Sequence, residues 1–283
     1  MPMKTKPANS ALAPSRRHDV VAHVAAKQLI PGFGNVTAKD MIVPRLKLLQ
    51  GLSPEVTEDP RKFFRGEFFH SVVGECIGES LTVVPLQIQR TIELWAPRDD
   101  ERGILARSMD GVHWDKPNTK FEVRIRGRKV IWDTAETVGD SGLADFGSSD
   151  PSNPRSAPVA SLTYRLALFM PDKEDWGPCL MICAKTATRP IMDLISRVNL
   201  RHLAGTPFYA QKYNLSAIKR SNEQKYEWHI PAFRNDGNID DYNLRDRLKG
   251  MAEAMATLNV RAQDDRPEEE VPEREDKSGN VSY

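Results

Sequence analysis

The feature that most constrains the fold is a period-two stretch, FEVRIRGRKVIW, at residues 121–132. Apolar residues alternate there with charged ones, which is the pattern of a β-strand with one buried face. Gly127 and Arg128 suit the two central positions of a type II′ turn, in which glycine takes the first position. The stretch therefore predicts a β-hairpin in which Val123 lies opposite Trp132.

The polar side of this hairpin is basic. In the predicted register Arg124, Arg126 and Lys129 share the face opposite the apolar one, and Arg128 lies at the tip. Like charges directly across a hairpin are destabilising, so we expect an anionic group to compensate them. Four bases at one hairpin tip are the first indication of an anionic partner.

Other segments extend the β pattern and add a few helices. We predict strands within residues 66–95, 159–170, 179–187 and 207–233, helices at 20–30, 189–204 and from 240 or 241 onward, and a long mobile loop at 134–158. A helix between the later strands favours a mainly β fold with a few helices, an OB-type Greek-key barrel with long insertions. A β-sandwich is the alternative.

Charge is unevenly distributed along the chain. Residues 264–283 hold eight acids and three bases, a charge of −5, so with a net charge of +1 for the whole chain residues 1–263 carry +6. We predict a disordered segment at 1–18, one nucleic-acid-binding domain at 19–263 and a disordered acidic tail at 264–283. A basic body with an acidic tail is typical of nucleic-acid-binding proteins.

Several protein classes do not fit the sequence. Three cysteines at irregular spacing argue against a disulfide framework, and Cys179 and Cys183 are expected to be buried thiols on one strand face. We find no Walker A, G-x-S-x-G or H-E-x-x-H motif, no signal-peptide pattern and no apolar run long enough for a membrane span. We therefore expect a cytoplasmic protein that is not an enzyme, with no cofactor, metal or membrane contact.

Basic and aromatic residues are interleaved in two places, and together they are the candidate DNA-binding residues. Cations that follow phosphates, beside rings that stack on unpaired bases, are what single-stranded nucleic acid requires. The cations are Arg124, Arg126, Arg128, Lys129, Lys212, Lys219, Arg220 and Lys225, and the rings are Trp132, Tyr209, Tyr213, Tyr226 and Trp228. The alternative is that the alternating rings at 213, 226 and 228 form the core face of a hairpin.

The order of segments resembles the single-stranded DNA-binding proteins of tailed bacteriophages, a divergent OB-fold group. The resemblance lies in IVPRLKLLQGLSPEV, in GEFFHSVVGE leading into LTVVPLQIQRTIELW, in PFYAQKYNLSAI followed by YEWHIPAF, and in the acidic tail with a terminal aromatic residue. It implies that Lys47, Arg90, Trp95, Lys212, Tyr213 and Trp228 lie near a DNA groove. It also implies that the tail recruits replication or recombination proteins, although KSGNVS separates the last acid from Tyr283 here.

We therefore expect a sequence-independent binder of single-stranded DNA that protects intermediates of phage replication and recombination in the host cytoplasm. Its oligomeric state is left open, self-association included. Two alternatives come from other classes, namely a phage structural or assembly protein and a recombination annealing protein or nuclease.

Overall fold

The computed structural model of the protein describes residues 43–97, 100–125, 127–150 and 152–257. Contacts group them into one unit, Val43–Tyr283. The predicted disorder at 1–18, the predicted helix at 20–30 and the acidic tail at 264–283 lie outside the described residues.

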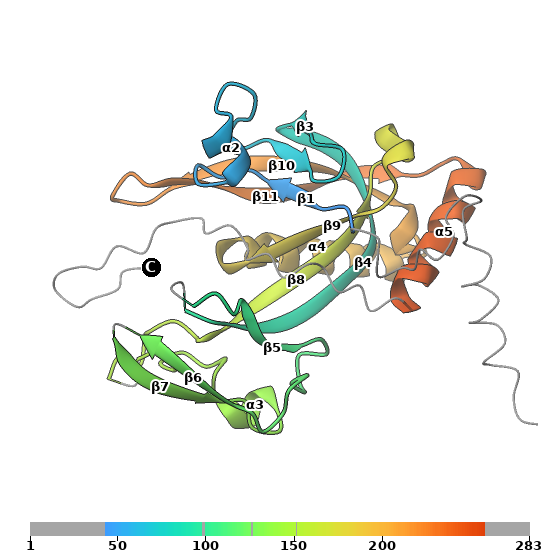
Figure 1. The fold of residues 1–283 in the computed structure, drawn as a ribbon. Helices are drawn as coiled ribbons and strands as arrows, with labels where there is room; N and C mark the ends of the chain where they lie inside the picture. Colours follow the sequence, from blue (N-terminus) through green and yellow to red (C-terminus); the bar gives the residue numbers. More distant parts are fainter. Residues whose placement is uncertain (1–42, 98–99, 126, 151, 258–283) are drawn as a thin grey trace, which may run out of the picture. The chain divides into compact units, whose positions relative to one another are not determined.

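The described chain is mainly β, as predicted, and its largest sheet is antiparallel (Figure 1). The strand order is β11-β10-β4-β8-β9, with β5 paired to β4 off this path. These strands are β4 (Ser80–Trp95), β5 (Ile104–Ser108), β8 (Ala160–Phe169), β9 (Cys179–Ala184), β10 (Gln211–Ser221) and β11 (Glu227–Asn238). Among the described strands the ladders leave β9 and β11 as edges, so no closed barrel is formed by backbone pairing.

Smaller elements complete the described chain. One three-stranded sheet contains β1 (Leu46–Leu48), β2 (Phe68–His70) and β3 (Glu75–Gly78), and a two-stranded sheet contains β6 (Lys120–Ile125) and β7 (Arg128–Asp133). The helices are α2 (Pro54–Glu58), α3 (Val138–Ser141), α4 (Thr188–Leu203) and α5 (Tyr242–Thr257), with short 3₁₀ turns η2 (Pro171–Trp176), η3 (Lys185–Ala187) and η4 (Phe208–Ala210).

The long strand β4 links the parts of the sheet. Its first residues pair with β10, its last residues pair with β5, and its other edge pairs with β8 over most of its length. A register shift between Pro85 and Gln87 interrupts the β8 ladder. Proline lacks a backbone N–H and is tolerated inside sheets mainly at such bulges.

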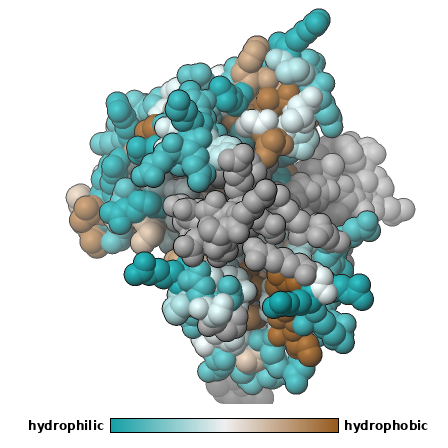
Figure 2. All heavy atoms as spheres, turned by 90° about the vertical axis from the view of Figure 1, so that its left-hand side faces the viewer, coloured by the Kyte–Doolittle hydropathy of each residue, from teal (hydrophilic) through white to brown (hydrophobic). Residues whose placement is uncertain are grey.

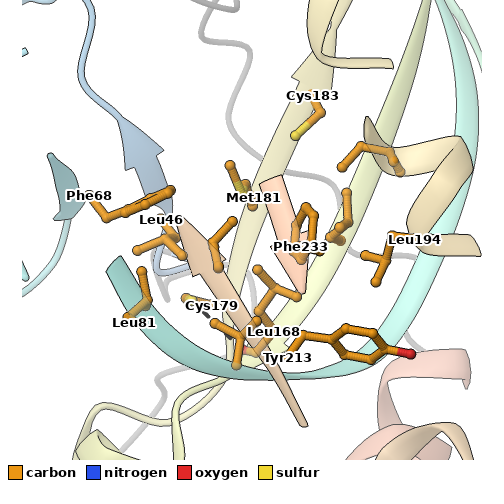
Figure 3. Packing of buried hydrophobic residues seen from close by; sticks show 14 of the residues in the cluster. Leu46, Phe68, Leu81, Leu168, Cys179, Met181, Cys183, Leu194, Tyr213 and Phe233 are labelled. Atoms are coloured by element: carbon orange, nitrogen blue, oxygen red, sulfur yellow. Dashed lines mark hydrogen bonds between the residues drawn. The ribbon is translucent and has the colours of Figure 1, made fainter. Parts of the chain in front are cut away.

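The main core lies on one face of this sheet (Figure 3). Alternate residues of β8, Leu166 and Leu168, pack there with Cys179 and Cys183 of β9 and with Tyr213 of β10. The prediction that both cysteines are buried on one strand face is confirmed. Helix α4 adds Ile191 and Leu194 to this core, two members of the apolar stripe expected from the sequence.

The opposite face of the β4–β8 pair carries α5, and we call it the α5 face. Val84, Leu86 and Phe169 pack there against Leu248 of the helix. The 4-3-4 spacing of Leu244, Leu248, Met251 and Met255 predicts an apolar seam on α5, and all four residues pack on this face. The Asp241 side chain accepts hydrogen bonds from the backbone N–H groups at the start of the helix. Both faces of β4 and β8 are therefore covered along this stretch.

Residues 104–159 form a second core with the end of β4. Trp114, Trp132, Val138 and Leu143 are buried in it together with Leu94. The prediction of a long mobile loop at 134–158 is therefore wrong in part. That segment contains α3, capped by the Thr137 side chain, and it buries apolar residues that the abundance of Gly, Ser and Pro concealed.

The predicted hairpin at 121–132 exists, but its turn lies one residue earlier than predicted, so each cross-strand partner shifts by two residues. Val123 lies opposite Val130, and Phe121 lies opposite Trp132, so the turn is centred between residues 126 and 127. Gly127 still has a positive φ of 77°. A shift of two residues changes the cross-strand partners but keeps each side chain on its predicted face, because the side-chain period is two.

Candidate nucleic-acid interface

One face of the β10–β11 hairpin brings a cation and an aromatic ring together. Arg220 lies directly opposite Trp228, and Ile218 lies opposite Ile230 in the neighbouring pair. Alternate positions of a strand share a face, so these four residues form one surface, which we call the Trp228 face. Ile230 is buried, Ile218 and Arg220 are exposed, and Trp228 is half-buried.

The opposite face of the same hairpin carries a compensated charge. Lys219 and Arg65 both contact the Glu227 carboxylate, at 2.5 Å and 3.1 Å. The hydrogen bond from Lys219 is the main reason that the pKa of Glu227 is lowered. Lys219 therefore does not share a surface with Arg220, although the sequence analysis grouped them.

Two of the predicted stacking rings are not available for stacking. Tyr213 is 0% exposed, and its hydroxyl donates a hydrogen bond to Gln211 Oε1 at 2.7 Å. Trp132 is 8% exposed in the second core. Both rings serve as core residues, because their strand positions face the apolar side. This is the alternative that the sequence analysis kept open for Tyr213.

The remaining predicted residues are spread over several elements. Lys47 is paired with Glu55 at 2.8 Å, and Tyr209 packs edge-on against Phe208. Trp95, Lys212 and Tyr226 are half-buried, whereas Arg90 and Lys225 are exposed. Lys225 lies in the β10–β11 turn with a φ of 64°, and the turn is held by a hydrogen bond from its N–H to the Asn222 carbonyl.

The basic hairpin β6–β7 supplies its own compensating anion. Arg124 lies directly opposite Lys129, whereas the predicted register placed Arg126 opposite Lys129. Lys129 Nζ contacts the Glu122 carboxylate at 2.6 Å on the same face. Arg128 lies opposite Ile125 and is exposed, and Arg126 is outside the described residues.

The turn end of β10–β11, on the left in Figure 1, faces the viewer in Figure 2. Hydrophilic side chains dominate the coloured surface in that view, and hydrophobic ones form small separate patches. The coloured part of this view therefore shows no large apolar patch.

A second group of cations, which the sequence analysis missed, lies on the α5 face. Arg107 of β5 lies directly across from Glu93 of β4, and Arg165 of β8 reaches the same carboxylate. The distances are 3.3 Å from Arg107 Nε and 2.5 Å from Arg165 Nη2 to Glu93 Oε1. We call these three residues the Arg–Glu–Arg triad. Two guanidinium charges against one carboxylate give it a formal charge of +1.

The triad is buried, and Arg165 is incompletely satisfied. Arg165 is 3% exposed and Glu93 is 1% exposed. Arg165 Nε and Nη1 have no hydrogen-bond partner within the described part of the chain. Burial lowers the pKa of the Arg165 guanidinium from its usual value, and the charge of Glu93 opposes that shift. A buried donor without a partner costs about 1–3 kcal/mol, so this arrangement is unusual for a purely structural arginine.

A sequence signal for the triad does exist. Arg165 interrupts an otherwise apolar strand, LTYRLALF, at a position where charged residues are rarely buried unless they are paired. Glu93 stands in the same way inside TIELW. What the sequence does not contain is the pairing between strands about 70 residues apart that brings these two side chains together.

Within the described residues no helix is long and apolar enough to span a membrane. In the same part of the chain no group of three or more His, Cys, Asp or Glu side chains is arranged to hold a metal ion.

Comparison with known proteins gives one result. Residues 14–261 match the family described as Pam3 phage gp34-like protein. No curated protein and no solved structure matches the chain.

Proposed function

The chain belongs to the Pam3 phage gp34-like protein family, and from that premise we propose that it binds single-stranded DNA without sequence preference. In this proposal it protects single-stranded intermediates of phage replication and recombination in the host cytoplasm and has no catalytic activity of its own. The observation that carries the proposal is the Trp228 face, on which Arg220 and Trp228 are direct cross-strand neighbours. A cation beside a flat ring matches the alternation of phosphate and base along a single strand.

The strand order supports an OB-type arrangement for this binder. Three strands, β4, β8 and β9, pair in sequence, α4 follows, and the β10–β11 hairpin joins the sheet on the other edge of β4. An OB fold is a five-stranded, partly open Greek-key barrel whose loops bind oligonucleotides. In this arrangement the β4–β8 connection would contain β5, β6 and β7 as an insertion, and the β10–β11 turn would be the second binding loop.

Residues 45–50, which include β1, contact both edge strands of the sheet, β9 and β11. Arg45 forms an isolated parallel bridge with Leu180 of β9. On the other side, the Gln50 side chain exchanges hydrogen bonds with the backbone of His229 in β11, both at 2.9 Å. These contacts support a partly open barrel in which residues 45–50 connect the two edge strands without a continuous ladder.

The test is titration of a fluorescently labelled oligo-dT with the full chain at rising salt, followed by anisotropy. We expect binding that weakens linearly in a plot of log K against log salt, and weaker binding to a duplex of equal length. Affinity that does not depend on salt, or no preference for single strands, would contradict the proposal.

The same preparation separates the alternatives. Large homo-oligomers formed without DNA, seen by sedimentation, together with no strand preference would indicate a structural or assembly protein. Cleavage of the oligonucleotide in the presence of magnesium would indicate a nuclease, and accelerated pairing of complementary strands would indicate an annealing protein. In our proposal the acidic segment at 264–283 contacts replication or recombination proteins, and a pull-down with that segment removed tests this part separately.

A further inference from the structure

The Arg–Glu–Arg triad lies beside a partly enclosed cavity of about 20 Å³ on the α5 face. Arg165 lines this cavity together with Gln87 and Gln89 of β4, and Val43, Pro178 and Met255 form part of its wall. A site of this size accepts a water molecule or one oxygen-bearing group of a ligand. Most of its wall is apolar, and Arg165, Gln87 and Gln89 form its polar side, so the cavity admits one oxygen of a ligand rather than a whole oxyanion.

The donors around the cavity outnumber the acceptors. Arg165 presents Nε and Nη1 without partners in the described residues, and its Nη2 is already bound to Glu93. The Gln87 amide likewise makes no hydrogen bond within the described residues, whereas the Gln89 amide donates to the Met109 carbonyl at 3.2 Å. Glu93, the carboxylate that Arg165 contacts, is shared with Arg107. Because Nη2 is bound to Glu93, the Nε–H and Nη1–H groups point in different directions, and each can donate one charge-assisted hydrogen bond to a phosphate oxygen.

From this geometry we infer that Arg165 and Gln87 bind one oxygen of a phosphate group at the α5 face. The inference deepens the proposed function, because a phosphodiester of single-stranded DNA and free inorganic phosphate present the same oxygens. The site would complement the Trp228 face: one would hold a phosphate in a fixed position, and the other would stack on a base.

The first experiment uses inorganic phosphate alone as the probe. The melting temperature of the full chain is measured at constant ionic strength while chloride is replaced by phosphate, since a ligand that binds only the folded state raises it. We expect a rise for the wild type and for Arg189→Gln, which removes an exposed arginine of α4. We expect loss of the rise for Arg165→Gln and for Gln87→Leu.

The second experiment distinguishes the two sources of phosphate. If the site holds a DNA phosphodiester, Arg165→Gln should reduce the slope of log K against log salt for oligo-dT by about 0.7, the value for one phosphate contact on a single strand. A slope equal to that of the wild type, with the phosphate-dependent rise intact in the wild type, assigns the site to free phosphate.

Two further outcomes complete the test. If Arg165→Gln does not fold, Arg165→Lys retains the charge but loses the paired N–H groups and should show a weaker response to phosphate. A wild-type melting temperature that does not respond to phosphate, or a response in Arg165→Lys and Gln87→Leu equal to that of the wild type, would overturn the inference. If phosphate raises the melting temperature of a protein that does not bind oligo-dT, the phosphate site is supported and the proposed function is refuted.

Discussion

The hairpins β6–β7 and β10–β11 share a pattern of basic and apolar residues but differ in which of these residues lie on the same face. Both alternate basic residues with apolar or aromatic ones. In β6–β7 the rings of Phe121 and Trp132 are a cross-strand pair that packs into the second core, and the cations Arg124 and Lys129 lie on the opposite face. In β10–β11 Arg220 and Trp228 are cross-strand neighbours on one face.

The difference shows what a basic and aromatic strand pattern can and cannot indicate. Binding a single strand by stacking and charge requires rings and cations on the same face. The odd or even position of a residue decides which face its side chain lies on. The register across the turn decides which residue of the other strand is its neighbour. Only β10–β11 meets the requirement among the two hairpins, and the charge of β6–β7 is already reduced by Glu122.

The largest effect on stability should come from removing the Trp132 ring of β6–β7. Trp132→Ala deletes a buried side chain from the second core and should lower the free energy of unfolding by about 3–5 kcal/mol. Urea denaturation followed by circular dichroism measures it, and Trp132→Phe should cost clearly less. A loss below about 1 kcal/mol would mean that this ring is not a core residue.

Removing the ring of β10–β11 should instead affect binding. Trp228→Ala should weaken oligo-dT binding by about 1–3 kcal/mol, which is roughly 5- to 150-fold, because it deletes one stacking surface. Anisotropy titration at one fixed salt concentration measures it. Trp228→Phe keeps a flat ring and serves as the control, which should retain most of the affinity. Equal losses in both variants would argue against stacking.

The two sets of cations should differ in salt dependence. Arg220→Gln should reduce the slope of log K against log salt by about 0.7, as expected for one phosphate contact on a single strand. Lys129→Gln should leave the slope near that of the wild type, because Glu122 already neutralises this lysine. A larger change for Lys129→Gln than for Arg220→Gln would reverse our assignment of the two hairpins.

The smallest effect concerns the compensated face of β10–β11. The pKa of Glu227 is lowered, first by the hydrogen bond from Lys219 and then by the charges of Lys219 and Arg65. A carboxyl whose folded pKa lies below its unfolded pKa stabilises the fold above the unfolded value, and this contribution is lost as pH falls through the folded value. NMR titration should find the pKa of Glu227 below its usual range, and Lys219→Met should raise it toward that range.

Local periodicity predicted much of the fold. The strands around Leu166 and Cys179, the stripe of α4 and the seam of α5 follow from alternation and helical spacing within single segments. Such patterns depend only on neighbours in sequence, so one chain is sufficient to detect them. The sequence also predicts the hairpin at 121–132 but not its register, because the glycine can occupy either central position of a two-residue turn.

The candidate site was less predictable, because it depends on contacts across the sheet. Tyr213 was grouped with Trp228 since both are aromatic, yet one faces the main core and the other lies across from Arg220. The sequence of β8 shows a single arginine in an apolar strand but not its partner, because only the pairing of β4 with β8 brings Arg165 to Glu93. Residues far apart in sequence meet through topology, which composition and spacing do not contain.

The central claim is that Trp228 stacks on a base beside Arg220, and tryptophan fluorescence tests it most directly. The chain has five tryptophans, and we expect oligo-dT to quench mainly the emission of Trp228. The account predicts quenching in the wild type and in Trp132→Phe, and loss of most of it in Trp228→Phe. Quenching that persists unchanged in Trp228→Phe, or a wild type that shows none at saturating oligo-dT, would contradict it.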